Sequence, residues 1–188
     1  MEKSIFENYQ NRLIAALNSI DHDQVLMVAN LLSKSTLKNK RIWLIGNGGS
    51  ATTASHFATD LTRCVGSNNK KLKGISLCDN IGIITAIGND FGFDNIFLRQ
   101  VERNCESEDV LMAISASGSS GNLIKAINWA NEAGITTVGL TSFDGGIMRN
   151  LVNFSIHTDA ENGDYGVAED AHLAICHMIS EALRPQNT

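Results

Sequence analysis

The sequence lacks several features that mark whole classes of protein. Its four cysteines are far apart and show no zinc-type or redox-type spacing, so we expect reduced, buried thiols in a cytoplasmic protein. Basic residues are not in excess, and a net charge of −5 argues against broad nucleic-acid binding. No apolar run approaches bilayer length and no signal-peptide pattern is present, so no membrane partner is expected. Without repeats or linkers, the 188 residues predict one domain, 1–188.

What the sequence does contain is a regular alternation of helical and strand-like segments. Apolar residues at helical spacing predict two leading helices within 1–34, for subunit contact or for coverage of the sheet. From 41 to 183, short apolar runs alternate with helical patterns, which predicts a doubly wound α/β domain with a five-stranded parallel sheet flanked by helices. Strands are expected at 42–45, 74–77, 109–114, 136–140 and 154–157; later helices are expected at 81–87, 94–104, 123–132 and 167–183, with a turn at 88–93.

The stretch from Ile42 to Asp60 is the strongest candidate for a site. A buried strand runs into a glycine-rich turn, and Ser50 can cap the helix that follows, whose N-terminus favours an anion. His56 and Asp60 stand four residues apart and therefore share one face of that helix. Because ligands bind beyond the carboxyl ends of parallel strands, this turn, Asp79 and the loop 115–120 should meet in one crevice.

A dinucleotide site is one alternative for the glycine turn. The segment from Gly46 to Ala51 fits G-x-G-x-x-A. That motif requires an acidic residue about 20 positions later, at the end of the next strand. Asp79 ends the next strand but lies well beyond that spacing, so the dinucleotide interpretation is disfavoured.

The serine-rich loop favours phosphate binding. Ser115, Ser117, Ser119 and Ser120 lie between a strand and a helix N-terminus, where hydroxyl and backbone N–H groups can hold a phosphate with little positive charge. The alternative is a flexible loop whose serines only cap the helix.

The last helix carries a second group of chemically active side chains. Glu169 and His177 can share one broad face, and His172 lies on a neighbouring side. Together with Asp170 they could act as general acid and base or hold a zinc-type ion. A structural role is the alternative for a lone histidine, but the His56 and Asp60 pair in the same predicted crevice favours function.

Taken together, the motifs resemble those of the SIS (sugar isomerase) family, in its phosphoheptose isomerase branch. The resemblance covers nearly the whole chain. It implies an SIS-type fold and conversion of sedoheptulose 7-phosphate to D-glycero-D-manno-heptose 7-phosphate, for a bacterial lipopolysaccharide or capsule. It also implies one Zn²⁺ per subunit and a homotetramer with the leading helices at its core and active sites between subunits. The matching segments are Gly46–Ala51, Ser55–Ala58, Ala86–Phe93 and Ile114–Gly118.

The resemblance also implies roles for individual residues. Asp60 would be the catalytic base and His177 the catalytic acid. The implied metal ligands are His56, Asp60, Glu169 and His177. The implied substrate contacts are Asn47, Gly48, Ser50, Asp79, Ser115, Ser117, Ser120 and Glu169.

Several positions depart from the family pattern. Asp60 stands where a glutamate is usual, which shortens the reach of the base, and Glu169 replaces a glutamine, which favours a divalent metal. Val167 replaces an arginine, and Arg63 fits its expected arginine position imperfectly. These departures leave open an isomerase of another sugar phosphate, or a non-catalytic SIS binding protein. A metal acting as a Lewis acid also competes with free acid–base use of the same side chains.

Overall fold

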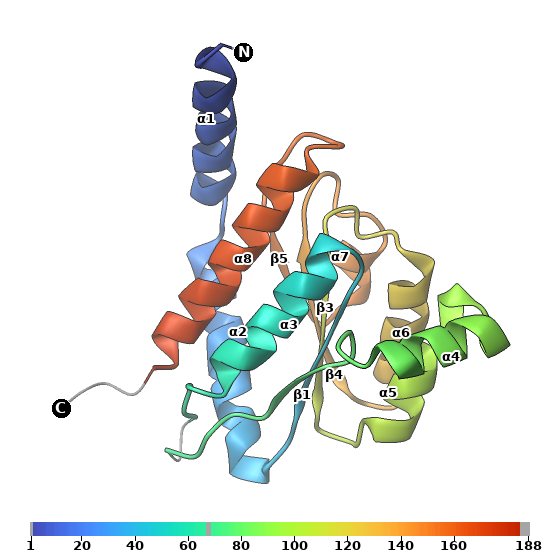
Figure 1. Cartoon of the computed structure of the whole chain (residues 1–188). Helices are drawn as coiled ribbons and strands as arrows, with labels where there is room; N and C mark the ends of the chain where they lie inside the picture. Colours follow the sequence, from blue (N-terminus) through green and yellow to red (C-terminus); the bar gives the residue numbers. More distant parts are fainter. Residues whose placement is uncertain (1, 67–68, 185–188) are drawn as a thin grey trace.

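The computed structural model describes residues 2–66 and 69–184, and these form an α/β fold around one five-stranded sheet (Figure 1). The strand order is β2-β1-β3-β4-β5, and every neighbouring pair is parallel. This confirms the predicted doubly wound parallel sheet. The strands are β1 Ile42–Gly46, β2 Gly74–Ser76, β3 Val110–Ser115, β4 Thr136–Thr141 and β5 Phe154–His157.

Helices cover both faces of the sheet. One face carries α2, α3 and α8, and the other carries α4, α5, α6 and α7 (Figure 1). The helices are α1 Ser4–Asn18, α2 His22–Ser35, α3 Gly49–Leu61, α4 Ile81–Phe91, α5 Leu98–Asn104, α6 Gly121–Glu132, α7 Met148–Leu151 and α8 Tyr165–Ala182, with 3₁₀ turns η1 Thr36–Lys38 and η2 Phe93–Asn95.

The interior strand β1 shows why the sheet needs two layers of helices. All five of its residues are buried. Ile42 and Leu44 enter the core under α2, α3 and α8, whereas Trp43 and Ile45 enter the core on the opposite face. A strand buried on both faces reads as a continuous apolar run, as the sequence predicted.

The region after β2 differs from the sequence-based expectation. The predicted turn at 88–93 is wrong in its first part, because α4 continues through Gly88 to Phe91. The helix ends at Gly92, whose φ of +83° glycine adopts without a steric cost. The predicted helix 94–104 is divided into η2 and the shorter α5. The short helix α7 was not predicted.

The first helix stands away from the sheet and packs against the N-terminal part of α8 (Figure 1). Tyr9 donates a hydrogen bond to Asp170 at 2.5 Å, and Arg12 Nε donates to Asp164 at 2.7 Å. The hydrogen bond to Asp170 raises the pKa of Tyr9 to about 12. Polar contacts at both ends of one helical turn thus fix the direction of α1.

Among the described residues, no helix is both long and apolar enough to cross a membrane. All four cysteines are free thiols, and burial raises the pKa of each of them.

Candidate functional site

The glycine turn places the start of α3 at the carboxyl end of β1. Gly48 has a φ of +54°, and the helix begins at Gly49. Gly48 therefore holds the cap position, and the predicted capping role of Ser50 is wrong: Ser50 lies inside the first turn and is buried. Since Gly48 offers no side-chain oxygen to the first N–H groups of α3, these groups remain open to a partner from another part of the chain or to a ligand.

The serine loop is organised by two of its own hydroxyl groups. Ser115 Oγ accepts a hydrogen bond from the N–H of Gly118 at 3.1 Å, and Ser117 Oγ accepts one from Ser119 at 3.4 Å. Gly118, with a φ of +61°, packs so closely against the carbonyl of Gly145 that a side chain would overlap it. Two side-chain hydrogen bonds and the close packing of Gly118 on Gly145 thus hold the loop in a turn.

Ser120 occupies the cap position of α6, but its hydroxyl makes no capping hydrogen bond there. Its backbone carbonyl accepts from Leu123 and Ile124 instead, at 3.0 Å each. The hydroxyl of Ser120 and the first N–H groups of α6 thus face the same helix end. This is the arrangement that a phosphate group can bridge.

A residue that the sequence analysis missed joins these two loops. Asn47 and Asn122 exchange two amide hydrogen bonds of 2.9 Å each. Asn122 is 2% exposed and lies in the first turn of α6. No sequence motif singles out Asn122. The only available signal was the prediction that the glycine turn and the loop 115–120 meet in one crevice, which the pairing of β1 with β3 bears out.

Asp79 lies just beyond the end of β2, at the predicted edge of the sheet. It is exposed, and it accepts a hydrogen bond from Ser55 on α3. The Ser55 hydroxyl also lies 3.2 Å from that of Ser76. Asp79 is therefore tied to α3 by Ser55, next to the glycine turn.

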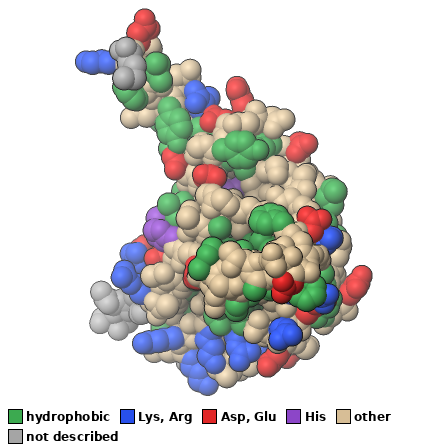
Figure 2. Space-filling model, turned by 45° about the vertical axis from the view of Figure 1, so that its right-hand side comes forward, with side chains coloured by type: hydrophobic (Ala, Val, Ile, Leu, Met, Phe, Trp, Pro, Cys, Tyr) green, Lys and Arg blue, Asp and Glu red, His purple; other side chains and the backbone are tan. Residues whose placement is uncertain are grey.

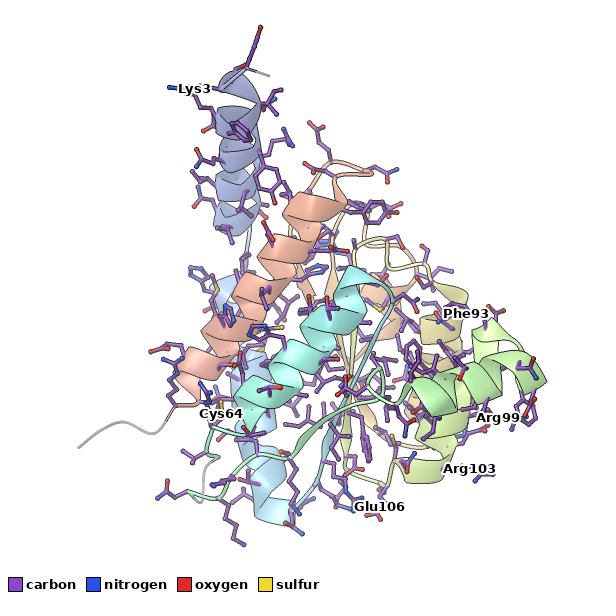
Figure 3. All side chains as sticks on the ribbon, in the orientation of Figure 1. Lys3, Cys64, Phe93, Arg99, Arg103 and Glu106 are labelled. Carbon is purple, nitrogen blue, oxygen red and sulfur yellow. The ribbon has the colours of Figure 1, made fainter. Side chains whose placement is uncertain are left out.

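The strongest cluster lies between α3 and α8, which run side by side in the same direction (Figure 3). The Nε2 atoms of His56 and His177 are 3.2 Å apart. Asp60 Oδ2 lies 3.5 Å from the first and 3.6 Å from the second. Both histidines are exposed and Asp60 is half-buried. The structure therefore brings together three of the four predicted metal ligands.

These three ligand atoms fit a zinc-type ion. In a tetrahedral site with bonds of about 2.0–2.1 Å, neighbouring ligand atoms are about 3.3 Å apart. The three separations of 3.2, 3.5 and 3.6 Å are close to that value. Two imidazoles and one carboxylate with solvent access are also a ligand set found in catalytic zinc sites, where a fourth position stays open.

Glu169, the fourth predicted ligand, is not in this group of three. Its half-buried carboxylate lies against Gly49, at the N-terminus of α3, where a Cβ would overlap it. Eight residues separate Glu169 from His177 along α8, which is about 12 Å of helix. Glu169 therefore lies at the glycine turn in this chain.

Two other acid–base residues of α8 have structural partners. Asp170 accepts the hydrogen bond from Tyr9. His172 is fully buried, and its Nε2 lies 3.1 Å from the Ser142 hydroxyl. Burial lowers the pKa of His172 to about 4, so this side chain stays neutral near pH 7.

Val167, which replaces the arginine implied by the resemblance, is buried between α8 and α1. It lines a cavity of about 320 Å³ that Arg12 also lines. The arginine that lines this cavity is therefore Arg12 of α1. Sequence reasoning missed it because α1 and α8 lie at opposite ends of the chain.

Comparison with known proteins agrees with this architecture. The SIS domain family model matches residues 6–142. A phosphoheptose isomerase from Aliarcobacter butzleri is 40% identical over 156 residues, which cover 82% of each chain. One from Geobacter metallireducens is 35% identical over 158 residues, 84% of this chain and 82% of the relative. The solved phosphoheptose isomerase from Neisseria gonorrhoeae superposes with a TM-score of 0.84 at 28% identity, covering 96% of this chain and 95% of that one. The chain therefore belongs to the SIS domain family, in its phosphoheptose isomerase branch.

Proposed function

We propose that this protein is an aldose–ketose isomerase that converts sedoheptulose 7-phosphate to D-glycero-D-manno-heptose 7-phosphate. The observation that carries the proposal is the cluster of Asp60, His56 and His177 between α3 and α8. The same helix α3 begins at a glycine turn that packs against Glu169, next to a serine loop suited to a phosphate. The relatives that share the fold and 35–40% of the sequence are phosphoheptose isomerases by name.

The phosphate would bind at the serine loop. Ser120 and the N-terminal N–H groups of α6 can donate hydrogen bonds to its oxygens, and the helix dipole favours its charge. The sugar chain would then extend toward the glycine turn, where Asn47 and Glu169 can bind its hydroxyl groups. A carboxylate accepts hydrogen bonds only, so Glu169 would select donor hydroxyls.

The reaction requires the transfer of two protons. The carboxylate of Asp60 would take a proton from C1, next to the C2 carbonyl, while His177 gives a proton to the carbonyl oxygen, and an enediol forms. Removing the proton from the C1 hydroxyl and returning one to C2 then gives the aldose. One carboxylate and two imidazoles lie close together here, and side chains of these types commonly serve as general base and general acid in proton transfer.

As the alternative state of this cluster, we propose that His56, Asp60 and His177 hold one zinc-type ion per subunit and then act as ligands in place of free acid and base. When bound, such an ion would supply Lewis-acid polarisation of the carbonyl oxygen. The histidines must then present neutral Nε2 atoms to it, and Asp60 a charged carboxylate. The family glutamate at position 60 would reach one methylene further. The shorter aspartate draws the carboxylate back toward its own helix, where it lies beside both rings.

We propose a homotetramer whose active sites lie between subunits. Helix α4 has no buried residue, and Ile81, Phe91 and Phe93 are between 53% and 71% exposed on or beside it. Figure 2 shows apolar side chains on the face that α4 forms and on the protruding α1, where Phe6 is 63% exposed. A cavity of about 390 Å³ between α4 and α5 continues this apolar surface. Such exposed apolar helices suit contact with further copies of the chain.

The four free thiols suit a cytoplasmic location, where the product would supply heptose for a bacterial surface polysaccharide such as a lipopolysaccharide or capsule.

A substrate panel tests the proposal. Wild-type protein is incubated with sedoheptulose 7-phosphate and, in parallel, with five-carbon and six-carbon ketose phosphates, and the aldose is followed by NMR. We expect preferred turnover of the seven-carbon substrate. Preferred turnover of a shorter ketose phosphate would make the chain an isomerase of another sugar phosphate. Binding without turnover of any of them would favour a non-catalytic SIS protein.

A further inference from the structure

The reciprocal amide pair of Asn47 and Asn122 connects the two loops to which the proposed function assigns the substrate. Asn47 belongs to the glycine turn after β1, and Asn122 belongs to the first turn of α6, directly after the serine loop. Asn47 Nδ2 donates to Asn122 Oδ1, and Asn122 Nδ2 donates to Asn47 Oδ1, both at 2.9 Å. These bonds hold the two loops at one separation.

The backbone fixes the orientation of both amides. The N–H of Leu123 donates to Asn122 Oδ1 at 2.9 Å, and only the oxygen of the amide can accept that bond. The nitrogen of Asn122 must therefore face Asn47, which in turn places the oxygen of Asn47 toward Asn122. Helix α6 thus determines which atoms Asn47 offers to a ligand.

The two partners differ in their access to solvent. Asn122 is 2% exposed, whereas Asn47 is half-buried. An amide has two N–H donors and two acceptor lone pairs, and the pair uses one of each on Asn47. One donor and one lone pair of Asn47 remain for a ligand, and in the described part of the chain no other side chain takes them.

We propose that Asn122 is a positioning residue for the isomerase reaction. It orients the Asn47 side chain and fixes the distance between the glycine turn and the serine loop, so that both can contact the same sugar phosphate. This inference rests on the proposed function for its ligand. It assigns to Asn122 no contact with the reacting atoms.

Substitution of Asn122 by aspartate tests the orientation directly. In Asn122→Asp the donor to Asn47 Oδ1 becomes a carboxylate oxygen, so two acceptors face each other and the Asn47 amide must turn or move away. Asn122→Ala removes the pair without a new charge. Asn131→Asp is the matched control: Asn131 lies on the same helix, near its far end, and its amide also makes a donor bond, to the carbonyl of Leu151, and an acceptor bond, from Thr137.

Three readouts separate positioning from a merely structural role. The first is the side-chain amide signal of Asn47 in ¹⁵N NMR of the ligand-free protein, which should shift in both Asn122 variants and stay in place in Asn131→Asp. The second is kcat and KM for sedoheptulose 7-phosphate, measured at a temperature well below the melting temperature of every variant. We expect Asn122→Ala to lower kcat/KM by about two- to tenfold, as for one neutral hydrogen bond, and Asn122→Asp to lower it further.

The third readout is a double-mutant cycle. In an Asn47→Ala background, Asn122→Ala should have less than about a twofold further effect on kcat/KM, because the residue through which it acts is gone. A full effect in that background, or Asn47 amide signals that do not move in either Asn122 variant, would overturn the proposal. If wild-type protein turned over no ketose phosphate, the proposed function would fail, but the NMR comparison of ligand-free proteins would still decide whether Asn122 positions Asn47.

Discussion

The carboxylate of Glu169 occupies the space in which a side chain on Gly49 would begin. The last helix of the chain thereby supplies an acidic group to the first glycine turn, although 120 positions separate the two residues in the sequence. Two turns further along the same helix pair, His177 meets His56 and Asp60. The pairing of α3 with α8 therefore creates both the substrate end and the metal end of the proposed site.

Gly49→Ala should impair activity without unfolding the protein. The new methyl group displaces the flexible end of Glu169, whereas alanine in the first turn of a helix costs no stability. We expect kcat/KM to fall by about tenfold or more, since small displacements of positioning groups are costly in catalysis, with an unchanged melting temperature. Gly166→Ala is the control, because a Cβ there meets the Tyr9 ring at an ordinary 3.5 Å. Equal activity of both variants would remove Glu169 from the substrate site.

Zinc affinity should show that Asp60 is a metal ligand and that Glu169 is not. Asp60→Asn removes a ligand of the cluster and should weaken zinc binding at least about tenfold, whereas Glu169→Gln should change it by less than about threefold. The measurement is competition with a chromophoric chelator at fixed pH. If Glu169→Gln weakens zinc binding as strongly as Asp60→Asn does, Glu169 belongs to the ligand set as the sequence suggested.

Acid should destabilise the fold partly through His172. Its pKa is about 4 in the folded protein, against 6.5 for the free side chain, because burial disfavours the charged ring. The unfolded chain therefore binds an extra proton between pH 6.5 and 4. The stabilising effect of the neutral ring is complete above pH 6.5 and is lost as the pH falls toward 4.

This linkage predicts a melting temperature that falls by several degrees over that range, since one pKa unit is worth ~1.4 kcal/mol. Thermal melts at pH 7, 6, 5 and 4 should show a smaller fall for His172→Gln. His22→Gln, which removes an imidazole from an exposed site, is the matched control substitution. Parallel curves for wild type and His172→Gln would show that His172 titrates normally.

The oligomer should depend on exposed apolar residues of α1. Phe6→Glu places a charge in the proposed contact and should shift the assembly toward smaller species, as measured by light scattering after gel filtration. Asn11→Glu adds the same charge to another face of the helix and should leave the assembly unchanged. A wild-type monomer at micromolar concentration would contradict the proposed tetramer itself.

The fold was accessible from the sequence because its signals are local. Buried strands such as Ile42–Gly46 are continuous apolar runs, and helices such as α6 end at a glycine, Gly134, with a φ of +72°. The exceptions have local causes as well. Gly88 does not adopt a positive φ and lies inside α4, whereas Gly92, with a φ of +83°, follows its last residue.

The site was accessible only in part. Spacing on one helix placed His56 beside Asp60, the acid–base residues of the last helix pointed to His177, and the resemblance implied that they act together. The partner of Asn47 is Asn122, and the arginine that lines the cavity beside Val167 is Arg12; both come from other segments, through packing that no local pattern encodes. His172 looked like a functional residue, yet its position on α8 turns it into the core.

The rate of ketose-to-aldose conversion by Asp60→Asn tests the central claim most directly. Wild type and variant are assayed with sedoheptulose 7-phosphate, each metal-stripped and each with added zinc, after thermal melts confirm that both are folded. We predict turnover by the wild type and a loss of about 10²–10⁴-fold in the variant, because an amide can neither take the C1 proton in the metal-free cluster nor give a bound zinc-type ion a charged ligand. A variant that turns over at the wild-type rate, or a wild type that does not convert the sugar in either state, would contradict it.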